Sequence, residues 1–384
     1  MPKVTNPNHR LRNIMKSKKT LLAIIIAVAV VAIAAVLLII KPWGGNDDSS
    51  SSSSAPDSSS VADSSTPDSS STTDVSSSEP EEPAKPLTPV DYYGEMKVVD
   101  GKIVGSKTNE LVRVTGMSFF WSNWSQKYYT KDYVDYMVDD YGCEVVRCSY
   151  GVMDDGVPYD TSCEPLIEDV IEQAIERGVY VIIDWHSHGA HNNPDEAVRY
   201  FGELAQKYGQ YDNVIFEVYN EPTQVLWKTV KEYAEIVIAE IRKYSDNLII
   251  VGSPQWSQKV MSAATNPIVD ENVAYTLHFY AGTHDKWLRD EADNAMEQGI
   301  AIFITEWGSV NADGNGAIAK QSTEEWFQWM DEKGISSCNW AINDKEEGSS
   351  IFVKDSNNEL TETGIYIKEL IKQRTDNAPW KKAS

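Results

Sequence analysis

The chain has 384 residues, of which 41% are hydrophobic, and a formal net charge of −24. This length suits one large domain or two modest ones. The acidity argues against nucleic acid as a partner, because binding a polyanion requires clustered Lys and Arg side chains. The sequence has no C-x-x-C pair and no zinc-like spacing, so we expect no metal and no cofactor. Three disulfide pairings, or none, are open to the four cysteines, which are Cys143, Cys148, Cys163 and Cys338.

The N-terminal forty residues have the pattern of a membrane anchor. Residues 1–20 form a basic tail, and residues 21–40 carry no charge, which is enough chain to cross the ~30 Å core of a bilayer. The basic flank predicts a cytoplasmic tail, with the rest of the chain on the extracellular side of the cell membrane. The alternative is a cleaved signal peptide and a secreted protein, although the apolar core of such a peptide is usually only ~7–15 residues.

Residues 45–89 form a low-complexity segment of Ser, Asp, Pro and Glu. A segment with so little apolar surface cannot build a packed core, so we expect a disordered linker. From residue 91 to residue 375 the pattern changes to alternating strands and helices, which indicates one folded α/β domain.

This domain contains eight short apolar runs typical of buried parallel strands. The predicted strands are 111–114, 144–147, 179–183, 214–218, 248–251, 273–277, 301–305 and 337–341, and the clearest helices between them are 163–177, 195–208, 227–244, 286–298 and 323–333. Eight such units favour a (β/α)8 TIM barrel. An open doubly wound sheet is the alternative, but its Gly-rich phosphate-binding turn is absent from the sequence.

Polar and aromatic residues stand at or just after the end of each predicted strand. All strand C-termini of a parallel barrel lie at one mouth, so residues scattered along the chain converge there. We therefore predict one cleft built from Ser118, Arg147, His186, Asn220, Glu221, Trp256, His278, Tyr280, Glu306 and Trp340.

Two carboxylates at one mouth, Glu221 and Glu306, suit glycoside hydrolysis. One protonates the leaving oxygen, while the other attacks the anomeric carbon or activates water. Arg147 should keep one of them ionised, and an apolar setting should keep its mate protonated. Asn220 is suited to bond a sugar hydroxyl. The spacing of Asp184, His186 and His188 also occurs in metal-dependent barrel hydrolases, but no Lys or Asp set completes a two-metal site.

An ordered set of motifs carries a family resemblance. The motifs are Gly116-Met117-Ser118, the strand with Arg147, Asp184-Trp185-His186, Asn220-Glu221-Pro222, His278-Phe279-Tyr280, Glu306-Trp307-Gly308 and Asn339-Trp340. Together they resemble the bacterial endoglucanases of glycoside hydrolase family 5, and the likeness covers residues 91–375. It implies a retaining (β/α)8 hydrolase of β-linked glucans, and we expect its catalytic domain to be monomeric.

The resemblance also implies a role for each matching residue. It makes Glu221 the acid/base and Glu306 the nucleophile, which Arg147 and Tyr280 orient and stabilise. The implied sugar-binding residues are His186, Asn220, His278, Trp256, Trp340, Trp124, Lys345 and Glu347. The chain departs from the family at Phe120, where a His is usual, and around His188, which we interpret as a polar loop residue.

The sequence therefore predicts a surface-tethered endo-β-1,4-glucanase that binds a β-glucan polysaccharide. Within the same class, the alternative is a relative that cuts mannan, xyloglucan or mixed-linkage glucan. A different class is an inactive glucan-binding surface protein. The intact glutamate pair argues against it, because binding alone needs no such pair.

Overall fold

The computed structural model describes residues 86–152 and 161–383. The predicted basic tail (1–20), the predicted membrane anchor (21–40) and all but the last residues of the predicted linker (45–89) lie outside these ranges. Within the described ranges, no helix combines the length and the apolarity that a bilayer crossing needs.

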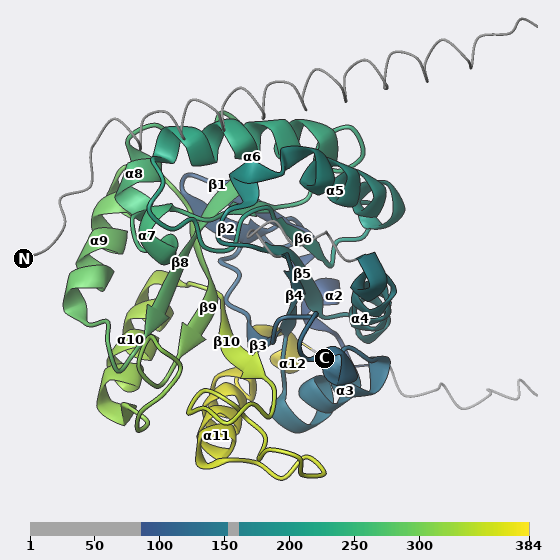
Figure 1. The fold of residues 1–384 in the computed structure, drawn as a ribbon, viewed down its shortest axis with the longest axis vertical. Helices are drawn as coiled ribbons and strands as arrows, with labels where there is room; N and C mark the ends of the chain where they lie inside the picture. The colour runs from purple at the N-terminus through teal and green to yellow at the C-terminus, as the bar shows by residue number, and fades with distance from the viewer. Residues whose placement is uncertain (1–85, 153–160, 384) are drawn as a thin grey trace, which may run out of the picture. The chain divides into compact units, whose positions relative to one another are not determined.

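Eight parallel strands close into a barrel in the order β10-β3-β4-β5-β6-β7-β8-β9, and Figure 1 shows them at the centre of a ring of helices. The strands are β3 (Thr115–Phe119), β4 (Val145–Gly151), β5 (Tyr180–His186), β6 (Val214–Glu217), β7 (Ile249–Val251), β8 (Val273–Tyr280), β9 (Ile302–Gly308) and β10 (Ser337–Ile342). The predicted barrel is confirmed, and the open doubly wound sheet is wrong because β10 pairs with β3 and closes the sheet.

The helices surround the barrel as the alternating pattern predicts. The longer ones are α4 (Glu164–Arg177), α5 (Pro194–Tyr208), α6 (Trp227–Ile241), α9 (Lys286–Glu297), α10 (Lys320–Lys333) and α11 (Glu362–Thr375), and the shorter ones are α2 (Pro89–Tyr93), α3 (Lys131–Tyr136), α7 (Pro254–Ser257), α8 (Val260–Ala264) and α12 (Pro379–Lys382). Helix α4 shows how the local sequence sets the ends of a helix. A proline stands in its first turn, and Gly178, with φ 67°, ends it. Its buried residues Ile167, Val170, Ile171 and Ala174 recur every three or four positions and face the sheet.

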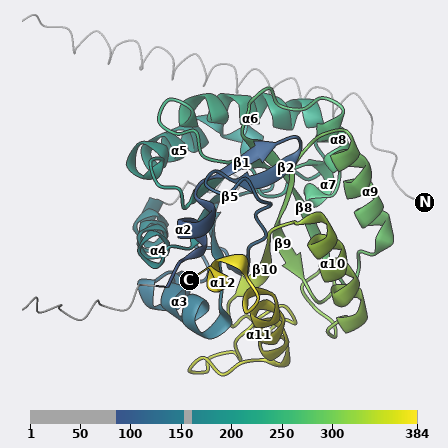
Figure 2. The same cartoon turned by 180° about the vertical axis from the view of Figure 1, so that it is seen from behind.

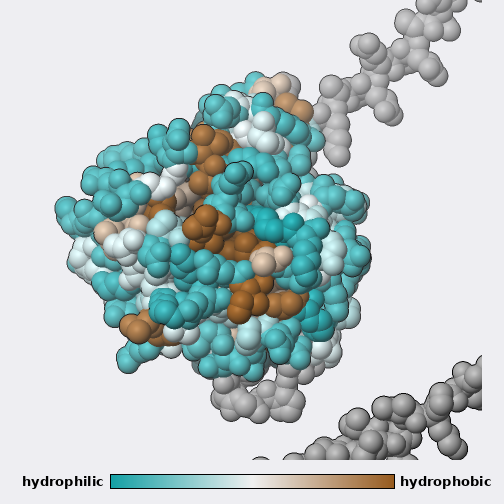
Figure 3. All heavy atoms as spheres, turned by 90° about the horizontal axis from the view of Figure 1, so that it is seen from above, coloured by the Kyte–Doolittle hydropathy of each residue, from teal (hydrophilic) through white to brown (hydrophobic). Residues whose placement is uncertain are grey.

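The face of the fold seen in Figure 3 is mainly hydrophilic. On the face in Figure 3, hydrophobic residues are exposed only in a few patches between hydrophilic neighbours. The four cysteines are buried and form no disulfide. Trp326 and Trp329 of α10 are also buried and belong to the main apolar core.

The first barrel strand differs from the prediction. The strand predicted at 111–114 is wrong: Leu111 makes only an isolated antiparallel bridge to Val104, and the barrel strand is β3, directly after it. The sequence of β3 lacks the run of branched apolar residues that is typical of a buried strand, because it has a glycine, Gly116, where the strand packs closely against β4. A Cβ atom at Gly116 would stand 1.7 Å from the carbonyl oxygen of Val145, so close packing requires glycine there.

Alternate residues of each strand point into the barrel. The lower interior is apolar and includes Val145, Tyr180, Ile182, Ile215, Ile250, Phe303 and Cys338. The hairpin of β1 (Met96–Val99) and β2 (Lys102–Gly105), which lies over this end in Figure 2, adds Met96 and Ile103 to the same core. Two positions after Val145, Ile182 and Ile215 come Arg147, Asp184 and Glu217, so a charged layer begins where the apolar layer ends.

Strand β9 has one more residue than its neighbour β8 where it enters the cleft. Thr276 pairs with Phe303 and His278 with Glu306, so a step of two residues along β8 matches a step of three along β9. The register toward β10 shifts in the same way. Such a bulge changes the direction of successive side chains. Here it lets the consecutive residues Thr305 and Glu306 both contact groups inside the barrel.

Candidate active site

Two adjoining cavities open at the C-terminal mouth of the barrel, and both reach the predicted glutamates. The larger, of about 580 Å³, is lined by Phe120, Trp121, Trp124, Val152, His186, His188, Glu221, Tyr280, Glu306, Ala312, Asp313, Gly314, Trp340, Lys345 and Glu347. The smaller, of about 240 Å³, is lined by Glu221, Trp256, Gln258, His278, Tyr280, His284, Glu306 and Ala312. Because Glu221 and Glu306 line both, the cleft extends to either side of the carboxylate pair.

Arg147 lies behind this cleft at the centre of the charged layer. The prediction that it closes its strand is wrong, since β4 continues to Gly151. Its guanidinium is fully buried and bonds Glu217 through Nε (2.7 Å) and Nη2 (3.2 Å), Asp184 through Nη2 (2.9 Å) and Glu306 through Nη1 (3.1 Å). Burial raises the pKa of Asp184 and of Glu217 to about 7, although the charge of Arg147 opposes this rise.

Glu306 receives a bond from a different donor on each carboxylate oxygen. Arg147 donates to Oε2 at 3.1 Å, and the hydroxyl of Tyr280 donates to Oε1 at 2.8 Å. Burial, followed by the charge of Glu306, raises the pKa of Tyr280 well above its usual range, so Tyr280 keeps the proton that it donates. The two bonds fix the orientation of the Glu306 carboxyl group.

Glu221 has an environment that the sequence did not predict. Instead of an apolar setting, two imidazoles flank it: His278 Nδ1 lies 2.9 Å from Oε1, and His188 Nε2 lies 3.2 Å from Oε2. Burial would raise the pKa of Glu221, but the bonds from His188 and His278 outweigh it and hold that pKa below its usual range. Burial likewise would lower the pKa of His278, but the charges of Glu306 and Glu221 raise it. The two groups therefore compete for a proton.

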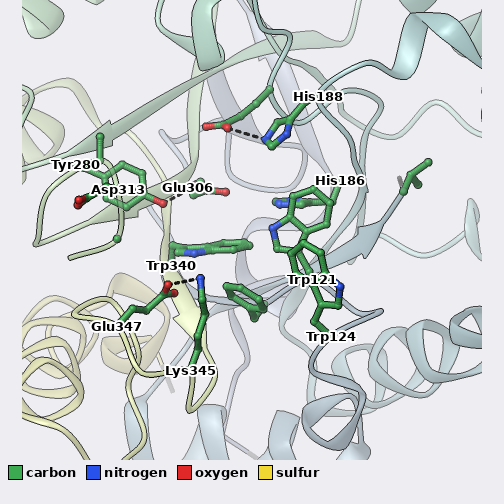
Figure 4. A pocket seen from close by; sticks show the side chains of 15 residues that line it. Trp121, Trp124, His186, His188, Tyr280, Glu306, Asp313, Trp340, Lys345 and Glu347 are labelled. Atoms are coloured by element: carbon green, nitrogen blue, oxygen red, sulfur yellow. Dashed lines mark hydrogen bonds and ion pairs between the residues drawn. The ribbon is translucent and has the colours of Figure 1, made fainter. Parts of the chain in front are cut away.

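His186 and Trp340 form the floor of the larger cavity. His186 Nδ1 lies 2.6 Å from Asp184 Oδ2, and its ring stacks on Trp340 with the centroids 5.0 Å apart. Burial and then the charge of Arg147 lower the pKa of His186 well below its usual range, so the ring is neutral. Figure 4 shows Trp121 and Trp124 on one side of this cavity, Tyr280 and Asp313 on the other, and Trp340 between them.

Asn220 is buried near the carboxylates, and only the oxygen of its side-chain amide has a hydrogen-bond partner among the described residues. Its Oδ1 accepts from Arg147 Nη2 at 2.6 Å, while Nδ2 has no hydrogen-bond partner among the described residues. A buried amide donor without a partner is costly. The donor could be satisfied by a hydroxyl group that enters the cleft.

Ser118, which was predicted in the cleft, lines neither cavity: it is buried, and its Oγ accepts from Arg147 Nη1 at 3.4 Å. Trp256, Lys345, Glu347 and Trp124 do line the cleft. Trp256 follows β7 in a turn where Gln255, Trp256 and Ser257 have φ of 55–58°, a strained conformation for residues other than glycine. Ser257 Oγ fixes this turn by donating to the carbonyl of Asn220 at 2.7 Å, and the ring of Trp256 stays 42% exposed. At the far end of the cleft Lys345 pairs with Glu347 at 2.5 Å.

Trp124 lines the same end and is 61% exposed. Phe120, which stands where the family usually has a His, packs on Trp340 with the ring centroids 5.1 Å apart. Trp121 also lines the cleft. This end of the cleft is therefore mostly aromatic.

Three functional residues were missed from the sequence. His188 was interpreted as a loop residue but contacts Glu221. Glu217 lies within the predicted strand 214–218 and is the last residue of β6, and Thr305 ends the predicted strand 301–305 and lies inside β9; neither was singled out as a site residue. A signal for Glu217 existed: an acid within the apolar run 214–218 must be buried, and a buried acid needs partners.

Glu221, His278 and Glu306 bring one ligand atom each within 4.8 Å of one another, and they form the group of described residues best placed to share a metal ion. The guanidinium of Arg147, 3.1 Å from Glu306, disfavours a further cation at this point. Asp184, His186 and His188 do not converge on one point, because His186 bonds Asp184 while His188 bonds Glu221. The arrangement suits proton transfer.

Comparison with known proteins agrees with this geometry. The family model "Cellulase (glycosyl hydrolase family 5)" matches residues 104–346, more than half of the chain. Endoglucanase Z of Dickeya dadantii is 49% identical over 263 residues, which are 67% of this chain and 62% of that protein. An endoglucanase of Clostridium saccharobutylicum is 37% identical over 295 residues, 73% of this chain and 65% of that protein. The chain thus spans less than two thirds of the length of these relatives.

Solved structures give the same result. The catalytic domain of an endoglucanase from Thermobifida fusca has a TM-score of 0.69 and 30% identity, covering 74% of this chain and all of that domain. A structure from Cytophaga hutchinsonii has a TM-score of 0.73 and 42% identity, covering 76% of this chain and 98% of that one. With its barrel, its glutamate pair and the match of the family model, this chain belongs to glycosyl hydrolase family 5.

Proposed function

We propose that this protein is an endo-β-1,4-glucanase that cleaves internal bonds of cellulose or related β-glucans with retention of configuration. One observation carries the proposal: a carboxylate oxygen of Glu221 and one of Glu306 lie within 4.8 Å of each other in an open cleft. This separation fits the ~5–5.5 Å typical of retaining glycosidases rather than the ~6.5–9.5 Å of inverting ones.

The bonds around each carboxylate support the assignment of roles. The carboxylate of Glu306, oriented by Arg147 and Tyr280, attacks the anomeric carbon, and the bond from that carbon to the leaving oxygen breaks. Glu221 gives its proton to the leaving oxygen. In the second step a water molecule gives a proton to Glu221 and attacks the same carbon, which releases Glu306. The unpartnered Nδ2 of Asn220 can donate to a sugar hydroxyl beside the reacting carbon.

The named relatives support the substrate class. Those proteins are called endoglucanases, and a variant of the Thermobifida fusca enzyme was solved in complex with cellotetraose. Exposed or half-buried aromatic rings on both sides of the carboxylates, Trp124 and Trp256, can stack on the flat faces of glucose units. We therefore place Trp340, His186, Lys345 and Glu347 on one side of the cleavage point and Trp256 on the other.

The test is the release of reducing sugar from carboxymethyl-cellulose by Glu306→Gln. Loss of the nucleophile should abolish turnover, while Glu297→Gln, which changes an exposed acid at the end of α9, should leave it unchanged. NMR of the first product formed should show the β-anomer. Substantial turnover in Glu306→Gln would reject the mechanism. Soluble mannan, xyloglucan and mixed-linkage glucan, assayed in parallel, decide between the substrate alternatives.

We further propose, from the sequence, that residues 21–40 hold the enzyme at the cell surface, with residues 45–89 as the tether. Fractionation of cells that express the full chain should place the activity in the membrane fraction. Recovery of a secreted form whose N-terminus lies after residue 40 would instead support a cleaved signal peptide.

A further inference from the structure

The hydroxyl of Thr305 has three polar partners in the interior of the barrel. Its Oγ1 lies 2.6 Å from Glu217 Oε1, 2.7 Å from Thr276 Oγ1 and 3.0 Å from His278 Nε2. A hydroxyl has one hydrogen to donate and two lone pairs that accept. All three positions are thus occupied, and the direction of each bond can be worked out from the partners.

The first direction follows from Glu217. Both of its oxygens accept from Arg147, Oε2 from Nε at 2.7 Å and Oε1 from Nη2 at 3.2 Å. Burial raises the pKa of both Glu217 and Asp184, but a carboxyl group held by two guanidinium bonds is the one that loses its proton first. Ionised Glu217 can only accept, so Thr305 donates its hydroxyl hydrogen to it.

The other two directions follow from Thr276 and His278. Thr276 Oγ1 already accepts from the backbone N–H of Thr305 at 3.2 Å, so its own hydrogen is free to point at Thr305 Oγ1. The second lone pair of Thr305 is then left for His278. A bond at this position requires a hydrogen on His278 Nε2.

This result determines what the other ring nitrogen can do. A neutral imidazole that carries its hydrogen on Nε2 has a bare Nδ1, and Nδ1 lies 2.9 Å from Glu221 Oε1. One proton is therefore shared across that contact, either as protonated Glu221 beside a neutral ring or as a carboxylate beside an imidazolium. The opposite tautomer would donate from Nδ1 and leave Glu221 without a proton to give.

We propose that Glu217 and Thr305 are positioning residues that fix the tautomer of His278 and so keep the catalytic proton on the Glu221–His278 pair. This inference rests on the proposed role of Glu221 as the general acid. Thr305 faces the interior by ordinary alternation from Phe303, and the bulge in β9 is what lets Glu306, its neighbour in sequence, enter the cleft as well.

Several other charged or titratable groups face the pair from neighbouring elements, and the test must hold them constant. They are Arg147 on β4, Asp184 and His186 on β5, His188 after β5, Tyr280 on β8, His284 after β8 and Glu306 on β9. Thr305→Val removes the hydroxyl with little change in shape and leaves every one of these groups in place. Thr305→Ser keeps the hydroxyl and is the matched rescue.

The readout is the dependence of rate on the leaving group, which a merely structural role would not move. The dinitrophenolate group of a dinitrophenyl cellobioside can leave without being protonated, whereas the phenol of a phenyl cellobioside needs a proton from the general acid. For Thr305→Val in the full chain we expect kcat/KM on the phenyl substrate to fall by about tenfold or more, out of the ~10²–10⁴-fold that general acid catalysis supplies. On the dinitrophenyl substrate it should change by less than about threefold, and Thr305→Ser should restore the wild-type ratio.

Equal losses on both substrates in Thr305→Val would overturn the inference while leaving the proposed function intact. A wild-type protein inactive on carboxymethyl-cellulose and on both cellobiosides would overturn the proposed function itself. If Thr305→Val fails to fold, nitrogen NMR of ¹⁵N-histidine-labelled wild-type protein decides. His278, assigned by the loss of its signal in His278→Gln, should carry a hydrogen on Nε2 at the pH of highest activity, and a bare Nε2 would refute the proposal.

Discussion

The contact between His188 and Glu221 predicts how the pH profile of the enzyme can be changed. His188 Nε2 lies 3.2 Å from Glu221 Oε2, and 44% of the His188 side chain is exposed to solvent. A donor at that distance favours the carboxylate form of Glu221, so it lowers the pKa of the proposed acid. Replacement of His188 by Gln or Ala should raise this pKa and move the basic limb of kcat/KM to higher pH.

The size of the shift follows from the contact. A hydrogen bond to a charged group contributes about 1.5–3 kcal/mol when it is buried. Solvent screening at a half-exposed imidazole reduces this to about 1 kcal/mol, and one pH unit corresponds to 1.36 kcal/mol. We therefore expect the basic limb to move up by about 0.7 pH unit in His188→Ala. The shift should be smaller in His188→Gln, whose amide can still donate.

The assay is kcat/KM on a soluble glucan across the pH range, because its basic limb reports the acid of the free enzyme. His191→Gln is the matched control. His191 lies on the same loop but bonds the hydroxyl of Tyr219 at 2.9 Å rather than Glu221, so it should leave the limb in place. A basic limb that stays fixed in both His188 variants, or that moves to lower pH, would refute the reasoning.

Two further predictions concern binding and stability. Trp256→Ala should lower kcat/KM on long glucans about fivefold, which corresponds to about 1 kcal/mol of lost stacking. The melting temperature should change little, because the ring is 42% exposed. An unchanged kcat/KM would show that Trp256 does not contact the substrate. Glu144 lies at the other end of the barrel, where it accepts from Trp380 Nε1 (2.7 Å) and the N–H of Thr115 (3.1 Å), and burial raises its pKa to about 7. The folded protein then holds a proton that the unfolded chain releases, so Glu144 should contribute a fall in stability of about 3 kcal/mol as pH rises from 4.5 to 7, in addition to the falls from Asp184 and Glu217. Urea unfolding of Glu144→Gln should lack this part of the slope, and a slope equal to that of the wild type would contradict the assignment.

The barrel could be predicted from the sequence because its strands appear as short apolar runs that alternate with helical segments. Seven of the eight predicted strands overlap barrel strands, since a strand buried on both faces needs a run of apolar residues such as Val214, Ile215 and Phe216. The first strand was misplaced for the opposite reason. Its close approach to β4 requires Gly116 where an ordinary strand would have a branched residue, so the apolar signal lies upstream, where Val112 and Val114 pack into the lower core.

The site was predicted as a set of residues but not as a network. Convergence at the strand ends follows from parallel topology alone, which is why Glu221, His278 and Glu306 could be brought together from the sequence. The bulge in β9 could not be foreseen, because it is a property of the register between strands. Without it Glu306, the neighbour of the inward-facing Thr305, would point away from the interior of the barrel. The contacts of His188 were hidden for a similar reason, since a loop residue acquires its partner only when the loop is folded.

The charges of the site explain why its members should act together. Three buried carboxyl groups, Asp184, Glu217 and Glu306, pair with Arg147, and a fourth, that of Glu221, lies within 4.8 Å of Glu306. If all four were ionised, the excess negative charge in a buried site would be expensive. Protons must therefore be retained, and the His278–Glu221 pair and the groups around Arg147 are where they can be held. Removing any one member redistributes those protons, so the effects of Thr305→Val and His188→Ala on the pH profile should not add. A strictly additive double variant would mean that each residue acts on Glu221 independently, and the pH profile would then belong to one carboxyl group rather than to the cluster.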